Sequence, residues 1–239
     1  MRRVLATFGI LVAVLLIGVL CLGIWLYFYT ADLPSIAQLA DFNPKSPTKA
    51  RLLTCDAVER EVTVTPRGEL GRYTVAAVTA TERKPESRSP YMSELFSPGE
   101  RHVASYQIQL ARTIACTQHH SSILKWHLQV LRLANAINRN FGEEELLTIY
   151  LNRIYLDSDV YGFENGAKRY FGKPASQLTL DETAVLVGMI RAPRVYSPIA
   201  HPDRAAQRRN SILDDMVAQG SVTKSDADAA KAIPIQGVQ

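Results

Sequence analysis

The sequence predicts a mainly α-helical domain, preceded by one membrane-spanning helix and carrying a small β element near the membrane. Three observations support this fold class. The run 4–29 contains no charged residue, and at 1.5 Å per residue it is long enough to cross about 30 Å of hydrocarbon. Between residues 123 and 140, apolar residues recur at intervals of three and four, which indicates an amphipathic helix. Residues 50–64 alternate loosely between apolar and polar, as in a short hairpin.

The N-terminal run is expected to be an uncleaved anchor in the cytoplasmic (inner) membrane. Arg2 and Arg3 precede it, so residues 1–3 should remain cytoplasmic and the bulk of the chain should lie on the outer, periplasmic face. A cleaved signal peptide is the alternative. The run is too long for the apolar region of a signal peptide, and no A-x-A cleavage site follows it.

The net charge of the chain limits the class of partner that it is expected to bind. The net charge of +4 and the isoelectric point near 9.0 suit an anionic partner such as a phospholipid headgroup or a pyrophosphate. No motif that reads nucleic acid accompanies this charge, so nucleic acid is not expected.

The cysteines allow two states. In an exported domain, Cys55 and Cys116 could form a disulfide or remain two buried thiols, and the sequence leaves both possibilities open. No set of metal ligands at finger spacing is found.

The chain divides into an anchor, a connecting segment and a helical domain. Residues 30–70 are expected to form a proline-punctuated stalk with the hairpin, and residues 71–239 to form the domain. The segment 83–101 contains three prolines and is predicted to be a mobile loop. Periodicity and helix-start signals predict helices in the domain at 72–82, from 105 onward, and at 123–140, 143–155, 161–171, 179–190, 202–219 and 224–232.

The C-terminal half resembles a known family. Its motifs are YLNRIYLDSDVYGFENGAKRYFGK, beginning at Tyr150, and LTLDETAVLVGMIRAPRVYSP, beginning at Leu178. They resemble the C-terminal half of family-51 peptidoglycan glycosyltransferases, which are the transglycosylase domains of bifunctional penicillin-binding proteins and their monofunctional relatives. The resemblance implies a lysozyme-like helical lobe with a small membrane-proximal lobe. It also implies that the protein polymerises lipid II into glycan strands.

The resemblance further implies partners and a cofactor. The partners would be lipid II, the nascent glycan, the membrane and other cell-wall synthesis proteins. The cofactor would be a divalent metal, Mg²⁺ or Mn²⁺, as is common in the family. No segment resembling a penicillin-binding domain follows Gln239, so penicillin binding is not expected.

The first motif of the family begins with a glutamate that acts as general base on the acceptor sugar's hydroxyl. Glu82 lies at this position, which makes it the candidate catalytic residue. The next motif residue, an aspartate, is replaced by Arg83, and the motif's histidine and glycine are absent. A neighbouring arginine lowers the pKa of a carboxyl group and so weakens it as a base.

The second and third motifs are also altered. In the second, Gln109 and Arg112 match, whereas both glycines are replaced, by His102 and Val103. The third motif is Arg-Lys-x-x-Glu, and an ungapped count back from Tyr150 places Val130 at its glutamate. A shift of one residue places Lys125 and Gln129 in the motif instead, so neither register supplies the motif's glutamate. In the family this second glutamate assists the departure of the lipid pyrophosphate.

Four residues are candidates for substrate binding. The departing pyrophosphate requires fixed positive charge, which Arg112 and Lys125 could supply if they are not ordinary exposed charges. Gln109 and Asn152 are the other two, and Asn152 has a structural role in the cleft wall as its alternative. Glu164 and Glu182 are expected to accept buried hydrogen bonds from the main chain.

The sequence leaves the present activity open. One hypothesis is a peptidoglycan glycosyltransferase of reduced or altered activity. The second hypothesis is a non-catalytic family-51 module that serves as a lipid II sensor or a scaffold in cell-wall synthesis. The third and simplest hypothesis is a decayed gene product with little function. Hydrolysis of glycan ranks below these, because it requires a carboxylic acid of raised pKa in an apolar pocket, and Glu82 lies beside Arg83.

Overall fold

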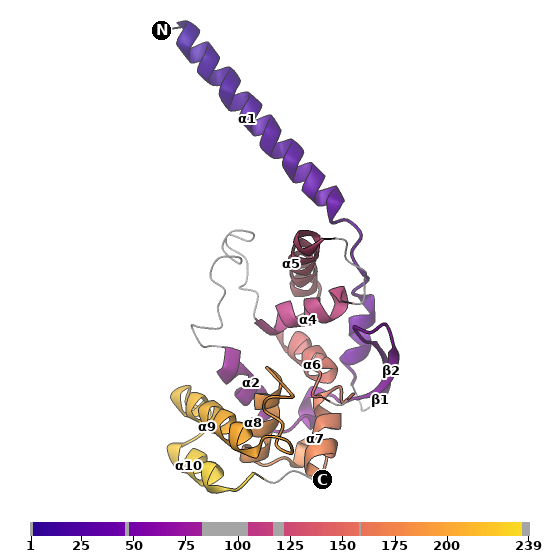
Figure 1. The fold of residues 1–239 in the computed structure, drawn as a ribbon, viewed down its shortest axis with the longest axis vertical. Coiled ribbons are helices and arrows are strands. Elements are labelled where there is room, and N and C mark those ends of the chain that lie inside the picture. Colours follow the sequence, from indigo (N-terminus) through magenta and orange to yellow (C-terminus); the bar gives the residue numbers. More distant parts are fainter. Residues whose placement is uncertain (1, 46–47, 83–104, 117–121, 158, 236–239) are drawn as a thin grey trace.

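The computed structural model describes residues 2–45, 48–82, 105–116, 122–157 and 159–235. Helix α1 (Arg2–Tyr29) projects away from the folded domain (Figure 1). Its segment Phe8–Tyr29 is long and apolar enough to cross a membrane, and none of the apolar window lies buried in the structure. The predicted N-terminal apolar helix is therefore confirmed.

The segment that follows the anchor contributes to the core. The short 3-10 helix η1 (Ala37–Phe42) buries Leu39 and Phe42 completely. Strands β1 (Thr48–Leu53) and β2 (Glu59–Val64) form the predicted antiparallel hairpin. Alternate residues of the hairpin face inward and join the same core as η1, namely Ala50, Leu52, Val62 and Val64.

The rest of the described domain is helical, as predicted. A short 3-10 helix, η2 (Arg67–Glu69), precedes the first long helix, and another, η4 (Ala175–Gln177), lies between α7 and α8. The longer helices are α2 (Thr74–Glu82), α4 (Ser105–Ala115), α5 (Ile123–Asn140), α6 (Glu143–Arg153), α7 (Phe163–Phe171), α8 (Leu180–Met189), α9 (Pro202–Ala218) and α10 (Lys224–Ala232). The predicted loop 83–101 lies outside the described residues.

The boundary between α6 and α7 differs from the prediction. The sequence predicts helices at 143–155 and 161–171, whereas α6 ends at Arg153 and α7 begins at Phe163. The reason is that Tyr155 and Tyr161 pair with each other in an isolated antiparallel bridge, which requires extended backbone on both sides of the turn.

Helix α6 is the central element. All residues from Leu146 to Arg153 are buried, and the helix contacts η1, β2, α4, α5 and α7. In Figure 1 it lies between the α4–α5 pair and the group formed by α7 and α8. Burial of each large apolar side chain contributes about 1.5–3 kcal/mol, so this helix is a main source of the domain's stability.

Carboxylates fix the starts of two elements, α8 and η4. Glu182 accepts hydrogen bonds from the main-chain N–H and the hydroxyl of Thr179, both at 2.8 Å, and completes a capping box at α8. Glu164 accepts a 2.8 Å hydrogen bond from the buried N–H of Ala175. Both glutamates therefore bind the main chain, as predicted, but only the hydrogen bond of Glu164 is buried and that of Glu182 is exposed.

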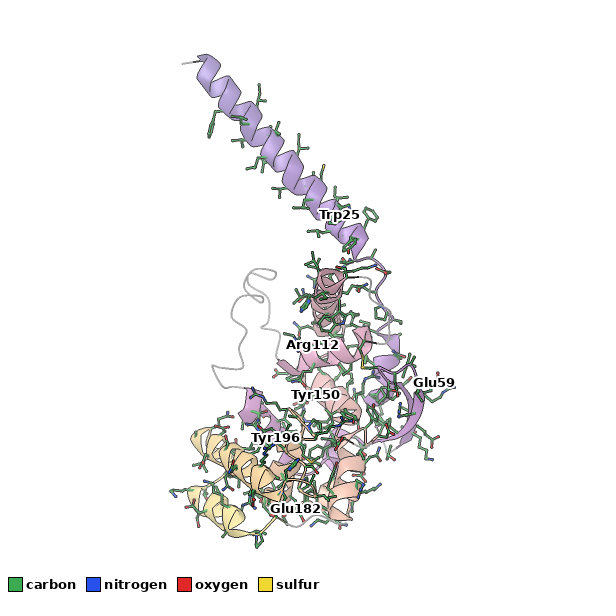
Figure 2. The ribbon with its side chains drawn as sticks, viewed as in Figure 1. Trp25, Glu59, Arg112, Tyr150, Glu182 and Tyr196 are labelled. Atoms are coloured by element: carbon green, nitrogen blue, oxygen red, sulfur yellow. A yellow bond between two sulfur atoms is a disulfide. The ribbon has the colours of Figure 1, made fainter. Side chains whose placement is uncertain are left out.

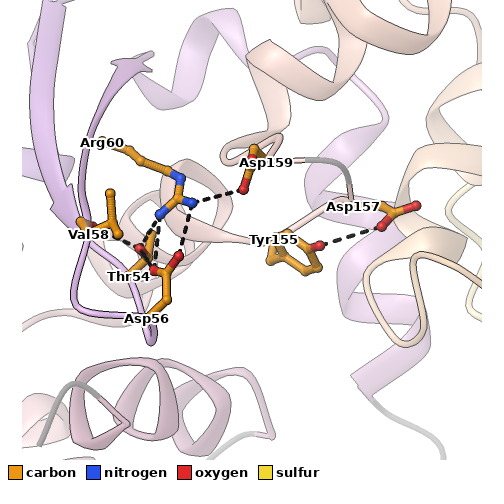
Figure 3. A network of polar contacts seen from close by, with 7 residues as sticks. All are labelled: Thr54, Asp56, Val58, Arg60, Tyr155, Asp157 and Asp159. Atoms are coloured by element: carbon orange, nitrogen blue, oxygen red, sulfur yellow. Dashed lines mark hydrogen bonds and ion pairs between the residues drawn. The ribbon is translucent and has the colours of Figure 1, made fainter.

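Besides its apolar packing, the hairpin is joined to the helical part by a disulfide and by a network of charged side chains. A disulfide joins Cys55, in the hairpin turn, to Cys116 at the end of α4, which resolves the alternative that the sequence leaves open. On the other side, Arg60 contacts both carboxylate oxygens of Asp56 and reaches Asp159, in the loop before α7, each at 3.0 Å (Figure 3). The hydrogen bonds from Arg60, and that from Thr54, lower the pKa of Asp56.

Candidate functional site

Two predicted site residues lie together on α4. Gln109 and Arg112 are three residues apart and so share one face of the helix. The hydroxyl of Tyr150, on α6, donates a 2.9 Å hydrogen bond to Oε1 of Gln109. The guanidinium carbon of Arg112 lies 6.0 Å from the centre of the Trp126 ring, on α5. Figure 2 shows Arg112 close to the centre of the domain, above Tyr150.

Arg112 presents an exposed positive charge at this place. Its side chain is exposed, and no ion pair to it is found among the described residues. A guanidinium group offers several N–H donors in a fixed plane, which suits a phosphate or pyrophosphate oxygen. The α4 face therefore combines an amide, a guanidinium group and two aromatic rings.

Lys125 lies elsewhere. Its ammonium nitrogen is 2.8 Å from Oδ2 of Asp32 and 5.5 Å from the centre of the Tyr29 ring. Both partners belong to the segment where the anchor ends. The structure therefore directs Lys125 to the stalk and does not bring it to Gln109 and Arg112.

Asn152 lies inside the fold. Its side chain is fully buried, and its amide nitrogen donates to the carbonyls of Phe42 at 3.1 Å and Thr65 at 2.9 Å. Its side-chain oxygen accepts from the N–H of Thr65 at 2.9 Å. These bonds join α6 to η1 and to the end of β2, which is the structural role that the sequence offers as the alternative to substrate binding.

Comparison with known proteins identifies the domain. The family model described as Transglycosylase matches residues 105–217, which extend from α4 to the end of α9. This segment of the chain is therefore similar to transglycosylase domains.

Known relatives agree with this assignment. Penicillin-binding protein 1A of Vibrio cholerae is 32% identical over 228 residues, which is 87% of this chain and 27% of the relative. Penicillin-binding protein 1A of Aquifex aeolicus is 39% identical over 53% of this chain and 17% of its own length. A putative transglycosylase of Cupriavidus necator is 39% identical over 44% of this chain and 45% of its own length. The chain thus spans less than half of each of these relatives.

The transglycosylase domain holds no acidic residue at the expected place of the second glutamate. In the ungapped register this place is Val130, which is 4% exposed and packs in the core. In the shifted register it is Gln129, which is 1% exposed and donates from Nε2 to the main-chain oxygen of Asp32 at 3.1 Å and to its Oδ1 at 3.2 Å. Either position is enclosed, and a carboxylate introduced there would lose its hydration.

Glu82 is the last residue of α2, and its side chain lies outside the described part of the structure. The helix before it is held by the C-terminal half of the domain. Helix α2 packs against α8 and α9, and the side chain of Gln219 donates a 3.2 Å hydrogen bond to the carbonyl of Ala80. The main chain that leads to the candidate base is therefore fixed by α8, by α9 and by the residue that follows α9.

The implied divalent metal finds no matching donor set among the described residues. No group of three His, Cys, Asp or Glu side chains comes together in the described ranges. Mg²⁺ and Mn²⁺ prefer several oxygen ligands, so the described side chains do not fit such an ion. No step is therefore assigned to a metal.

Three residues with defined roles are not among the predicted site residues. They are Asp32, Gln129 and Arg132, which connect the end of the anchor to α5. Lys125, Gln129 and Arg132 follow one another at intervals of four and three residues, which places the three side chains on one face of the helix. This spacing is the sequence signal that could have revealed Gln129 and Arg132.

Proposed function

We propose that this chain is a membrane-anchored peptidoglycan glycosyltransferase that polymerises lipid II into glycan strands. The observation that carries the proposal is the transglycosylase match over residues 105–217, which includes the α4 face with Gln109 and Arg112. The apolar helix α1 supports it, because a lipid-linked substrate is met at a membrane.

The proposed reaction transfers a sugar between oxygen atoms. The Glu82 carboxylate takes the proton from the acceptor hydroxyl, whose oxygen forms a bond to the anomeric carbon of the donor. The bond between that carbon and the pyrophosphate oxygen breaks, and the lipid pyrophosphate leaves with the electron pair. The Arg112 guanidinium group faces the negative charge that develops on this leaving group.

The proposed orientation places the domain on the outer face of the cytoplasmic membrane. Arg2 and Arg3 precede the apolar run, and positive residues favour the cytoplasmic side. The disulfide between Cys55 and Cys116 supports the same orientation, because disulfides persist in oxidising compartments outside the cytoplasm.

The test is a polymerisation assay with the full chain in detergent, supplied with lipid II and Mg²⁺. Wild type should give glycan product, and Glu82→Gln should reduce the rate by about 100-fold or more, the usual contribution of a general base. Glu69→Gln is the matched control, because Glu69 is exposed and lies outside the α4 face. Absence of product from wild type, or equal rates for wild type and Glu82→Gln, contradicts the proposal.

A non-catalytic lipid II sensor or scaffold is the second candidate. The burial of Val130 and Gln129 favours it, because neither can serve as the second acidic residue. Lipid II binding without product formation would support the sensor. Binding to other cell-wall synthesis proteins alone would support the scaffold. The similarity to transglycosylases favours the enzyme as the first candidate.

A further inference from the structure

The C-terminal end of the anchor is held by side chains of another helix. Lys125, Gln129 and Arg132 lie on one face of α5 and contact residues 27–32, where α1 ends and the stalk begins. In Figure 1, α5 lies directly beneath the end of α1. We call Asp32, Lys125, Gln129 and Arg132 the anchor clamp.

Arg132 binds the last turn of α1. It donates to the main-chain carbonyl of Tyr27 at 2.9 Å and to the hydroxyl of Thr30, and its guanidinium carbon lies 4.7 Å from the centre of the Tyr27 ring. The last carbonyls of a helix lack partners within the helix and carry partial negative charge. Helix α1 has no basic residue in its own last turn, so Arg132 of α5 provides the missing donor and positive charge.

Asp32 is bound by two further side chains of the clamp. Its carboxylate accepts from Lys125 at 2.8 Å, and this hydrogen bond lowers the pKa of Asp32. Gln129, which is buried, donates to both the main-chain oxygen and the carboxylate of Asp32. A single exposed ion pair contributes little. Here, however, three side chains hold a segment of six residues, and Thr30 within that segment is 2% exposed.

We infer that the anchor clamp fixes the orientation of the transglycosylase domain relative to the membrane. Helix α5 packs against α4 through contacts that include Trp126 and Arg112, and α4 is joined to the hairpin by the disulfide. A continuous set of contacts therefore leads from the membrane helix to the α4 face. The consequence for catalysis rests on the proposed function: a substrate whose lipid remains in the bilayer reaches this face only at a fixed height, so the clamp residues are positioning residues.

A distance measurement in lipid nanodiscs tests the clamp without turnover. One spin label is attached to the free thiol of Cys21, in the anchor, and the other to an exposed position on α9 through Gln207→Cys. The unmodified clamp should give a narrow distance distribution. Asp32→Lys should broaden it about twofold or more, because the domain then moves about the stalk as loops and termini do. The exchange Asp32→Lys with Lys125→Asp should restore most of the narrow distribution.

Two further variants keep the test decisive. Gln129→Leu removes the two hydrogen bonds to Asp32 and leaves the ion pair, so it should broaden the distribution less than Asp32→Lys does. Asp228→Lys is the matched control, because it disrupts an ion pair with Lys224 on α10, away from the anchor, and should leave the distribution unchanged. A wild-type distribution for both Asp32→Lys and Gln129→Leu overturns the proposal. So does a charge exchange that folds, with an intact disulfide and native circular dichroism, and yet stays broad.

The same variants separate the clamp from the proposed activity. If wild type makes glycan, Asp32→Lys should raise KM for lipid II in vesicles, and the charge exchange should lower it again. If wild type makes none and the distances behave as expected, the clamp stands and the proposed function fails. If the distances do not change and wild type makes glycan, the proposed function stands and the clamp fails.

Discussion

The two halves of the described domain use their polar side chains differently. From α6 to α10, buried polar groups bind the main chain of distant elements, as Asn152 does at Phe42 and Thr65, and as Arg209 does at the carbonyls of Lys231 and Ile233. On α4 and α5, polar groups bind other side chains or the stalk, or remain exposed, as Arg112 does. The residues that carry the resemblance to the family are thus largely those that hold the fold, whereas the proposed chemistry lies in the upstream half.

The largest change in the free energy of unfolding is expected on removal of the disulfide, which lies in the upstream half. The disulfide closes a sequence separation of 61 residues. Replacing both Cys55 and Cys116 by Ser should lower the free energy of unfolding by about 4 kcal/mol, from the chain entropy that the cross-link removes from the unfolded state. Denaturant unfolding of the full chain in detergent measures this, with Cys21→Ser as the control. A loss below about 1 kcal/mol would show that this half is held by its packing alone.

Asn152→Ala should give the next largest effect, and it probes the C-terminal half. The substitution removes three buried hydrogen bonds and leaves main-chain groups of Phe42 and Thr65 unpaired. The expected loss is about 3 kcal/mol in the free energy of unfolding. Asn140→Ala is the control, because the Asn140 side chain is exposed and, within the described part of the chain, bonds to its own helix at Ala136; it should change stability by about 0.5 kcal/mol or less. If the two variants behave alike, the buried amide does not stabilise the contact between η1, β2 and α6.

Sequence patterns predict this fold well where a period is long enough to be recognised. The limits of α5 follow from apolar residues at threes and fours, and the hairpin follows from alternation. Residues 37–42, in contrast, are too few to show a period, so their contribution of Leu39 and Phe42 to the core could not be predicted from the sequence. The Tyr155–Tyr161 bridge shortened two predicted helices for a similar reason, since pairing across a turn leaves no local signal.

The candidate site was less predictable than the fold. Gln109 and Arg112 lie together because helical spacing dictates it. Lys125 also belongs to a regular helix, but its role depends on what faces it, and the residue that faces it is Asp32, 93 positions earlier. Whether a charge contacts substrate or another part of the chain is decided by tertiary contacts, which neither spacing nor motif records.

The smallest change in the free energy of unfolding is expected at the network of Arg60 with Asp56 and Asp159, which joins the hairpin to the loop before α7 (Figure 3). Hydrogen bonds from Arg60 and Thr54 hold the pKa of Asp56 below its ordinary value. The folded state therefore binds a proton at Asp56 less readily than the unfolded state does. The stability that results is fully present above the unfolded pKa, near 3.9, and is lost as the pH falls through the lower folded value.

Asp56→Asn should thus lower the free energy of unfolding at pH 7. It should also make this free energy less dependent on pH below about 4. Unfolding in denaturant at pH 7 and at pH 3 measures the difference, with Asp41→Asn, an exposed carboxylate outside the network, as the control. The Asp56 carboxylate is itself solvent-accessible and screened, so its contribution should fall in high salt. An equal acid dependence in wild type and Asp56→Asn would mean that the hairpin is held to the helices by the disulfide and apolar packing, with no measurable part played by this network.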